Sequence, residues 1–159
     1  MYTELAGFGA SSDASQITKP QAQGQYRAMA MALEDAGLSP TDIGYTNAHG
    51  TATRLGDVVG TNAITASFCE SATRVAVSSA KALHGHLMGP TGLVEILAAL
   101  IAMRESVILA AANLRIADPE CDLDYVPNVA RTNVSMNAVM SNSFAFGGNN
   151  AVLIAKRVV

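Results

Sequence analysis

The segment TGLVEILAALIAM, residues 91–103, constrains the fold of this chain more than any other stretch. It has the composition of a helix that is apolar nearly all the way round, with Glu95 as its only ionisable residue before Arg104. Such a helix is expected to be buried on most sides, and a buried carboxylate requires a partner. Half of the 159 residues are hydrophobic and only 14% are charged. This balance indicates a core-rich α/β layer, or a piece of a larger protein that a partner covers.

Apolar periodicity predicts short strands that alternate with helices, with no sign of a second domain. Asp57 is expected to cap the second helix, residues 117–131 are expected to be a long loop, and the last two strands are expected to form a hairpin around SNSFAFGGNN. We expect helices at 20–36, 58–68 and 91–103, and strands at 2–10, 43–48, 74–78, 107–111, 138–140 and 151–155.

Charge and cysteine content exclude several classes of function. The net charge of -3 provides no basic footprint, so neither nucleic acid nor an anionic membrane is expected as a partner. The longest apolar run, residues 96–103, is too short to cross a membrane, and Glu4 stands where a signal peptide has a basic residue. Cys69 and Cys121 lack CxxC spacing and are expected to be reduced thiols. The expected location is therefore the cytoplasm.

All three histidines lie in two loops that follow predicted strands. His49 follows the strand at 43–48, and His84 and His86 follow the strand at 74–78 together with Lys81. Loops beyond the carboxyl ends of strands are where open α/β sheets usually bind ligands. His49 and His86 could each hydrogen-bond a bound carbonyl group, or could simply cap backbone groups of their loops. The residues alone leave both interpretations open.

The remaining polar residues also have two interpretations. Thr51 and Thr53 could bind a polar arm of a ligand, and Lys81 with Glu95 could be a structural ion pair or a charge that tunes a nearby histidine. Phe144 and Phe146, beside paired glycines, would by default pack in the core or hairpin.

Neither a metal nor a cofactor is predicted. On an extended segment His84 and His86 would point to the same side, but zinc requires three or four ligands and the sequence has no further cluster. The stretches GFGA and FGG lack the glycine spacing of nucleotide-binding loops. Cys121 lies in an acidic loop with Glu120 and Asp122, which would raise the pKa of its thiol, so a catalytic thiolate is not expected.

Four motifs together resemble the C-terminal signatures of the β-ketoacyl-acyl carrier protein synthases, including type II condensing enzymes and polyketide ketosynthases. They are NAHGTATRLGD, SSAKALHGHLMGPTG, NSFAFGGNN and, before the last, ECDLDYVPN. The resemblance implies a thiolase-like α/β fold, in which residues 1–159 are the C-terminal half of an α-β-α-β-α sandwich with a mixed sheet. It also implies that the nucleophilic cysteine lies in an N-terminal half outside this chain, so that the chain alone is inactive.

The same resemblance implies roles for individual residues. His49 and His86 would be the two catalytic histidines that bind the malonyl thioester carbonyl, while Lys81 and Glu95 would orient the second histidine and its neighbours. Phe146 would be a gating residue whose backbone N–H contributes to an oxyanion hole. Thr51, Thr53 and Phe144 would be substrate-binding residues, with the two threonines holding the phosphopantetheine arm.

The implied partners are an acyl carrier protein with phosphopantetheine-linked acyl and malonyl groups, the N-terminal half, and a second copy in a homodimer. A second hypothesis is a non-catalytic partner subunit like a chain-length factor, against which the intact histidines and lysine argue. A third hypothesis, a binding module that folds alone, is disfavoured because such a module would expose an apolar face.

The chain departs from the family pattern at a few positions in these motifs. His84 replaces the usual threonine before Gly-His, Ala145 replaces a glycine between the two phenylalanines, and Pro90 and Thr91 replace two alanines. These changes are expected to affect acyl-chain preference more than the type of reaction.

Overall fold

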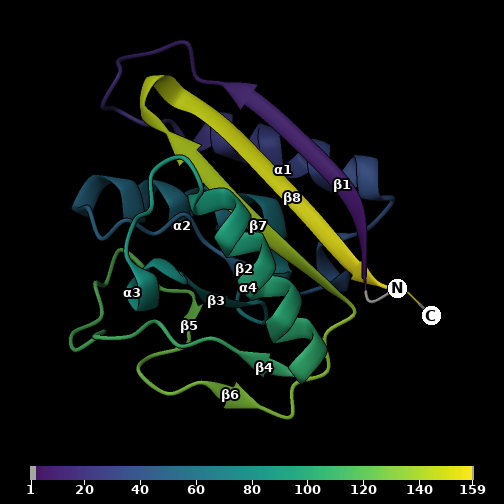
Figure 1. The fold of residues 1–159 in the computed structure, drawn as a ribbon. Coiled ribbons are helices and arrows are strands. Elements are labelled where there is room, and N and C mark those ends of the chain that lie inside the picture. The colour runs from purple at the N-terminus through teal and green to yellow at the C-terminus, as the bar shows by residue number, and fades with distance from the viewer. Residues whose placement is uncertain (1–2, 159) are drawn as a thin grey trace.

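The computed structural model describes residues 3–158 as one six-stranded mixed sheet with helices on both faces (Figure 1). The strand order in the sheet is β1-β8-β7-β2-β3-β5, and β4 and β6 form a separate two-stranded ribbon. The strands are β1 (Thr3–Ser12), β2 (Ile43–Asn47), β3 (Ala76–Ser78), β4 (Val107–Ile108), β5 (Asp124–Tyr125), β6 (Arg131–Thr132), β7 (Ala138–Ala145) and β8 (Asn149–Arg157). The helices are α1 (Ala22–Ala36), α2 (Arg54–Phe68), α3 (Lys81–His84) and α4 (Thr91–Glu105).

The sheet combines two kinds of pairing. Strands β7, β2, β3 and β5 are parallel to one another, whereas β8 pairs antiparallel with both β7 and β1. The first strand thus lies against the last, with Thr3 opposite Arg157. The hairpin of β7 and β8 confirms the expected pairing around SNSFAFGGNN.

Successive residues of the strands supply two cores, one on each face of the sheet. On the face covered by α1 and α2, Met140 of β7 packs with Met29 and Phe68. On the face covered by α4, the neighbouring Val139 packs with Met103. This alternation follows from the two-residue period of a strand.

Two glycines of β1 allow α1 to lie unusually close to the sheet. A Cβ atom added at Gly9 would lie 2.0 Å from the carbonyl oxygen of Ala28, and one at Gly7 would lie 2.3 Å from that of Ala32. Any side chain at these positions would collide with the backbone of α1. The close approach of helix and sheet therefore depends on both glycines.

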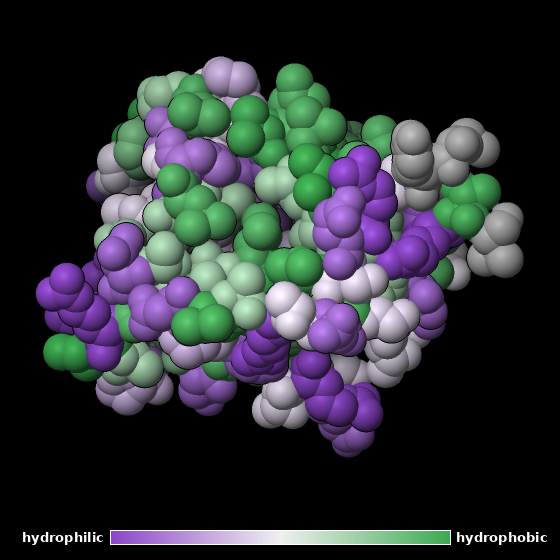
Figure 2. All heavy atoms as spheres, turned by 60° about the horizontal axis from the view of Figure 1, so that its bottom comes forward, coloured by the Kyte–Doolittle hydropathy of each residue, from purple (hydrophilic) through white to green (hydrophobic). Residues whose placement is uncertain are grey.

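Helix α4 differs from the expectation of burial on most sides. It buries one face, including Glu95 and Met103, but Leu93 is 63% exposed, Leu97 48% and Ile101 53%. Within residues 3–158, α4 packs with one side on the six-stranded sheet, and its opposite side meets solvent (Figure 1). Figure 2 shows apolar side chains exposed across the upper part of the surface seen from below Figure 1.

Several element boundaries also differ from the prediction. Helix α2 begins at Arg54 with Thr53 as its N-cap, because the N–H of Asp57 already bonds the carbonyl of Thr53 at 2.9 Å. The prediction of Asp57 as the cap was wrong. The predicted loop 117–131 contains β5 and the start of β6, while β7 and β8 extend beyond the predicted strands. Tyr2, the first residue of the predicted opening strand, lies outside the described residues.

Within residues 3–158, no helix has the length and apolarity needed to cross a membrane.

Candidate active site

The candidate site forms where the neighbouring parallel strands β2 and β3 end. Asn47 is the last residue of β2, and its side-chain Oδ1 accepts a hydrogen bond of 2.9 Å from the N–H of Ala80, just beyond β3. The hydroxyl of Ser79 donates to the carbonyl of Gly50 at 3.0 Å. These bonds join the loop that carries His49 to the segment that carries Lys81.

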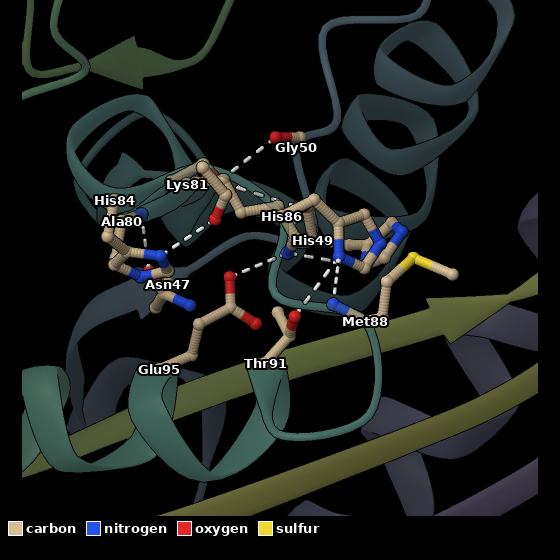
Figure 3. A network of polar contacts seen from close by, with 12 residues as sticks. Asn47, His49, Gly50, Ala80, Lys81, His84, His86, Met88, Thr91 and Glu95 are labelled. Atoms are coloured by element: carbon tan, nitrogen blue, oxygen red, sulfur yellow. Dashed lines mark hydrogen bonds and ion pairs between the residues drawn. The ribbon is translucent and has the colours of Figure 1, made fainter.

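Lys81 connects three parts of the site (Figure 3). Its ammonium group lies 2.6 Å from Oε1 of Glu95 on α4, donates to the backbone carbonyl of His49 at 2.5 Å, and lies 3.4 Å from Nδ1 of the His49 ring. Both charged side chains are buried. Both interpretations of Lys81 therefore apply at once. The residue forms an ion pair with Glu95, and it also places a positive charge beside a histidine.

The geometry shows which histidine Lys81 reaches. Lys81 and Glu95 were expected to orient the second histidine, His86, and its neighbours, and the residue that Lys81 contacts is His49. The reason is the pairing of β2 with β3, which brings the residue after one strand against the residue after the other.

The environment of His49 keeps its imidazole neutral. Burial, the charge of Lys81 and the nearby His86 together lower the pKa of His49 to about 4, and burial is the largest of these causes. An ammonium group can only donate hydrogen bonds, so Nδ1 of His49 must be the acceptor. The ring proton is then on Nε2.

His86 is fixed in the same tautomer by different contacts. Its Nδ1 accepts a hydrogen bond of 3.1 Å from the backbone N–H of Met88 and lies 3.1 Å from the hydroxyl oxygen of Thr91. Because an amide N–H only donates, Nδ1 of His86 is unprotonated and Nε2 carries the proton.

The two imidazoles lie together beside Phe144. The ring centroids of His49 and His86 are 5.9 Å apart with an interplanar angle of 87°, and the buried ring of Phe144 lies 5.9 Å from that of His49. Two Nε2–H donors held close together can bind one oxygen atom that gains negative charge during a reaction.

A cleft of about 2060 Å³ lies in front of this pair. Thr51 and Thr53 line it with their hydroxyl oxygens 3.4 Å apart, and His49, His86 and Phe144 also contribute to its wall. The same cleft is therefore lined by the two imidazoles and by two threonines that could bind a polar ligand.

Phe146 also lines the cleft but is not packed in the core. Its side chain is 77% exposed, in a turn whose Gly147 and Gly148 have φ angles of 80° and 72°. The default expectation of packing in the core or hairpin was right for Phe144, which is buried, and wrong for Phe146, which is exposed. Ala145 has an extended backbone with φ of -117°, which alanine adopts as readily as glycine, so its replacement of glycine introduces no strain here.

His84 does not join the other histidines. It ends α3, and the following Gly85, with φ of 78° and ψ of -179°, turns the chain so that His84 and His86 point to different sides (Figure 3). Nδ1 of His84 lies 2.7 Å from the carbonyl oxygen of Gly85. A shared direction was possible only on an extended segment, and His84 is helical. No group of three or more potential metal ligands occurs in the described part of the chain.

The sequence reasoning missed Asn47, Ser79 and the contact of Thr91 with His86. Asn47 and Ser79 lie at the ends of adjacent apolar strands, a position that could have marked them. The contact of Thr91 depends on the conformation of the turn between α3 and α4, which the sequence pattern does not predict.

Comparison with known proteins identifies the family. Residues 2–115 match the family model for the β-ketoacyl synthase C-terminal domain. The chain belongs to the β-ketoacyl synthase family. It is 43% identical over 159 residues to 3-oxoacyl-[acyl-carrier-protein] synthase 2 of Staphylococcus aureus (strain COL), a match that covers 99% of this chain and 38% of that protein. It is 44% identical over 158 residues to nodulation protein E of Rhizobium meliloti, with 99% and 39% covered.

Solved structures of other β-ketoacyl synthases share the fold. A β-ketoacyl synthase from Burkholderia phymatum superposes with a TM-score of 0.93 at 42% identity, covering 99% of this chain and 38% of that one. A type II polyketide ketosynthase in complex with its acyl carrier protein gives 0.94 at 30% identity, covering 99% and 39%. The expected thiolase-like α/β fold with a mixed sheet is confirmed. The chain spans about two fifths of the length of these relatives.

The Cys121 thiol of this β-ketoacyl synthase chain does not have the environment of a nucleophile. Burial raises the pKa of the Cys121 thiol, and the charges of Asp118, Asp57 and Glu120 raise it further. The predicted direction is confirmed, although burial is the larger cause and Asp122 is not among the contributing charges. Cys69 directly follows the last residue of α2 and is the first residue of a short 3-10 helix, Cys69–Ser71.

Proposed function

We propose that the protein containing this chain is a 3-oxoacyl-acyl carrier protein synthase, and that this chain supplies the two histidines that act on the malonyl group. The observation that carries the proposal is the pairing of two neutral imidazoles, each with its proton on Nε2, at the wall of the cleft. Relatives named as synthases of this kind support the same activity.

The reaction assigned to the site is a decarboxylative Claisen condensation. The bond between the α-carbon and the carboxylate carbon of the malonyl thioester breaks, carbon dioxide leaves, and the electron pair forms an enolate on the thioester. The Nε2–H groups of His49 and His86 donate to the enolate oxygen. The α-carbon then attacks the acyl group held on a cysteine, the C–S bond breaks, and the thiolate leaves. One such donor typically contributes about 2.7–4 kcal/mol to transition-state stabilisation.

The proposed donor of both groups is an acyl carrier protein. A ketosynthase that shares this fold is recorded in complex with its acyl carrier protein. Thr51 and Thr53 are proposed to hold the phosphopantetheine arm, since their hydroxyls line the same cleft as the histidines. Phe146 is proposed to gate the cleft, because its exposed side chain sits on a turn at the wall. The homodimer and the cytoplasmic location stay predictions.

The reactive cysteine is proposed to lie in an N-terminal half that packs on α4. The exposed row of Leu93, Leu97 and Ile101 repeats every four residues, so it forms one apolar stripe along the helix. A second layer of the sandwich would bury this stripe. Residues 1–159 would then be the C-terminal half of the α-β-α-β-α sandwich, inactive alone.

The test is malonyl decarboxylation by the full-length protein. Replacing His49 or His86 with alanine is expected to lower kcat by about 10²–10³-fold, because each substitution removes one oxyanion donor. Near-normal rates in both variants would overturn the assignment. A full-length protein that binds acyl carrier protein but releases no carbon dioxide would favour the chain-length-factor-like subunit instead.

A further inference from the structure

We propose that Thr91 is a positioning residue that holds the ring of His86 through its hydroxyl group. The inference rests on the proposed function for its effect on rate, but its effect on the His86 ring can be measured without any activity. Thr91 is the first residue of α4, and its hydroxyl oxygen lies 3.1 Å from Nδ1 of His86.

The direction of this hydrogen bond follows from the other contact of the ring. The N–H of Met88 donates to the same Nδ1, so that nitrogen carries a lone pair and no proton. The Thr91 hydroxyl must therefore donate as well. Two donors on Nδ1 fix the proton on Nε2 and also fix the rotation of the ring, because the lone pair lies in the ring plane.

The orientation of the His86 ring depends strongly on these hydrogen bonds, because neighbouring side chains do not enclose the ring as they would enclose a buried one. Residue His86 is exposed in the described structure, whereas Thr91 is only 5% exposed. A buried, β-branched threonine on a helix has few alternative rotamers, so it is a rigid support for a ring that packing does not confine. Lys81 and burial serve this purpose for His49, but neither applies to His86.

The hydroxyl of Thr91 is also not used to cap its own helix. Threonine near the start of a helix commonly satisfies a free backbone N–H, yet α4 has no side-chain cap bond among the described residues. Its N-cap position is taken by Pro90, whose fixed φ suits the start of a helix. The hydroxyl therefore acts on the histidine and not on the helix.

The experiment compares Thr91→Val, Thr91→Ser and Thr91→Ala in the full-length protein. Valine keeps the shape and removes the hydroxyl, serine keeps the hydroxyl and removes the methyl group, and alanine removes both. We expect Thr91→Val and Thr91→Ala to lower kcat for malonyl decarboxylation by about fivefold to tenfold, the effect of one hydrogen bond, with KM changed less. Thr91→Ser is expected to stay within about twofold of wild type.

The independent measurement is ¹⁵N NMR of the His86 ring. In wild type and Thr91→Ser, Nδ1 is expected to show the resonance of a hydrogen-bonded, unprotonated nitrogen, and in Thr91→Val it should move toward that of a free one. Equal spectra and equal kcat in the valine and serine variants would overturn the inference. Loss in both variants, in step with lower unfolding midpoints, would also overturn it, since packing would then be the cause. If wild type does not decarboxylate malonyl thioesters, the proposed function fails while the NMR comparison still decides the role of Thr91.

Discussion

His49 and His86 present the same atom to the cleft but are held by different forces. His49 is held by burial and by a buried ammonium group, while His86 is held by a backbone N–H and a hydroxyl. The motifs predict the two histidines and Lys81 as site residues, and the structure brings these three side chains together. The motifs could not predict which histidine Lys81 contacts, because that depends on the pairing of two strands about 30 residues apart in the chain.

The charge of Lys81 leads to a prediction about pH. Removing a nearby cation favours the imidazolium form, so Lys81→Met is expected to raise the pKa of His49 from about 4 part of the way toward 6.5, with burial still lowering it. The acid limb of malonyl decarboxylation by the full-length protein should move to higher pH. The double variant Lys81→Met/Glu95→Gln is the control, because it leaves no buried carboxylate without its partner. An acid limb that does not move in either variant would contradict this role of Lys81.

The low pKa of His49 also affects stability. In the unfolded chain His49 takes up a proton near pH 6.5, but in the folded chain only near pH 4. The stability associated with neutral His49 is therefore complete above about pH 6.5 and is lost as the pH falls toward 4. Replacing His49 with glutamine should flatten the loss of unfolding free energy in this window, as measured by denaturant titration at several pH values. An unchanged slope would show that other groups cause the acid sensitivity.

For helices and strands, the sequence predicted which elements exist better than it predicted where each one begins and ends. Helices α1 and α4 and the hairpin were predicted because their periodicity or turn residues are strong and local. Strand β5 was missed because two residues, Asp124 and Tyr125, carry no period, and they become a strand only by pairing with β3. Local pattern cannot reveal a strand that exists through a distant partner.

The close packing of α1 on β1 gives a prediction for Gly9. Gly9→Ala is expected to lower the free energy of unfolding by about 1–3 kcal/mol, because the new methyl group forces the helix away from the sheet. Gly60→Ala, within α2, is the matched control. A Cβ there meets only the side chain of Gln25, at 4.0 Å, so it should be neutral or stabilising by up to about 1 kcal/mol. Equal effects in denaturant unfolding would show that helix and sheet are not in tight contact.

At the scale of the whole molecule, the apolar stripe on α4 shows which features of the structure could be predicted from the amino-acid composition and which could not. The composition indicated either a core-rich α/β layer or a piece that a partner covers, and the exposed stripe favours the second interpretation. It did not indicate that the most apolar helix would be the one left open. That outcome depends on how many layers the molecule has, which no local pattern records.

The stripe leads to a prediction in the full-length protein. Leu97→Ala is expected to lower the free energy of unfolding by about 2–5 kcal/mol, the effect of truncating a fully buried leucine. Val129, 74% exposed in the segment between β5 and β6, provides the control, and Val129→Ala should change stability by less than about 0.5 kcal/mol. A Leu97 variant as stable as the Val129 variant would mean that the stripe stays in solvent.

The pairing of β1 with β8 has a topological consequence. Because Thr3 lies opposite Arg157 in the same sheet, the two ends of the described chain leave it at one corner (Figure 1). The geometry of the described chain is therefore compatible with circular permutation. A short linker could join the two ends. New ends could then be placed in the loop between β5 and β6 without interrupting a strand of the six-stranded sheet.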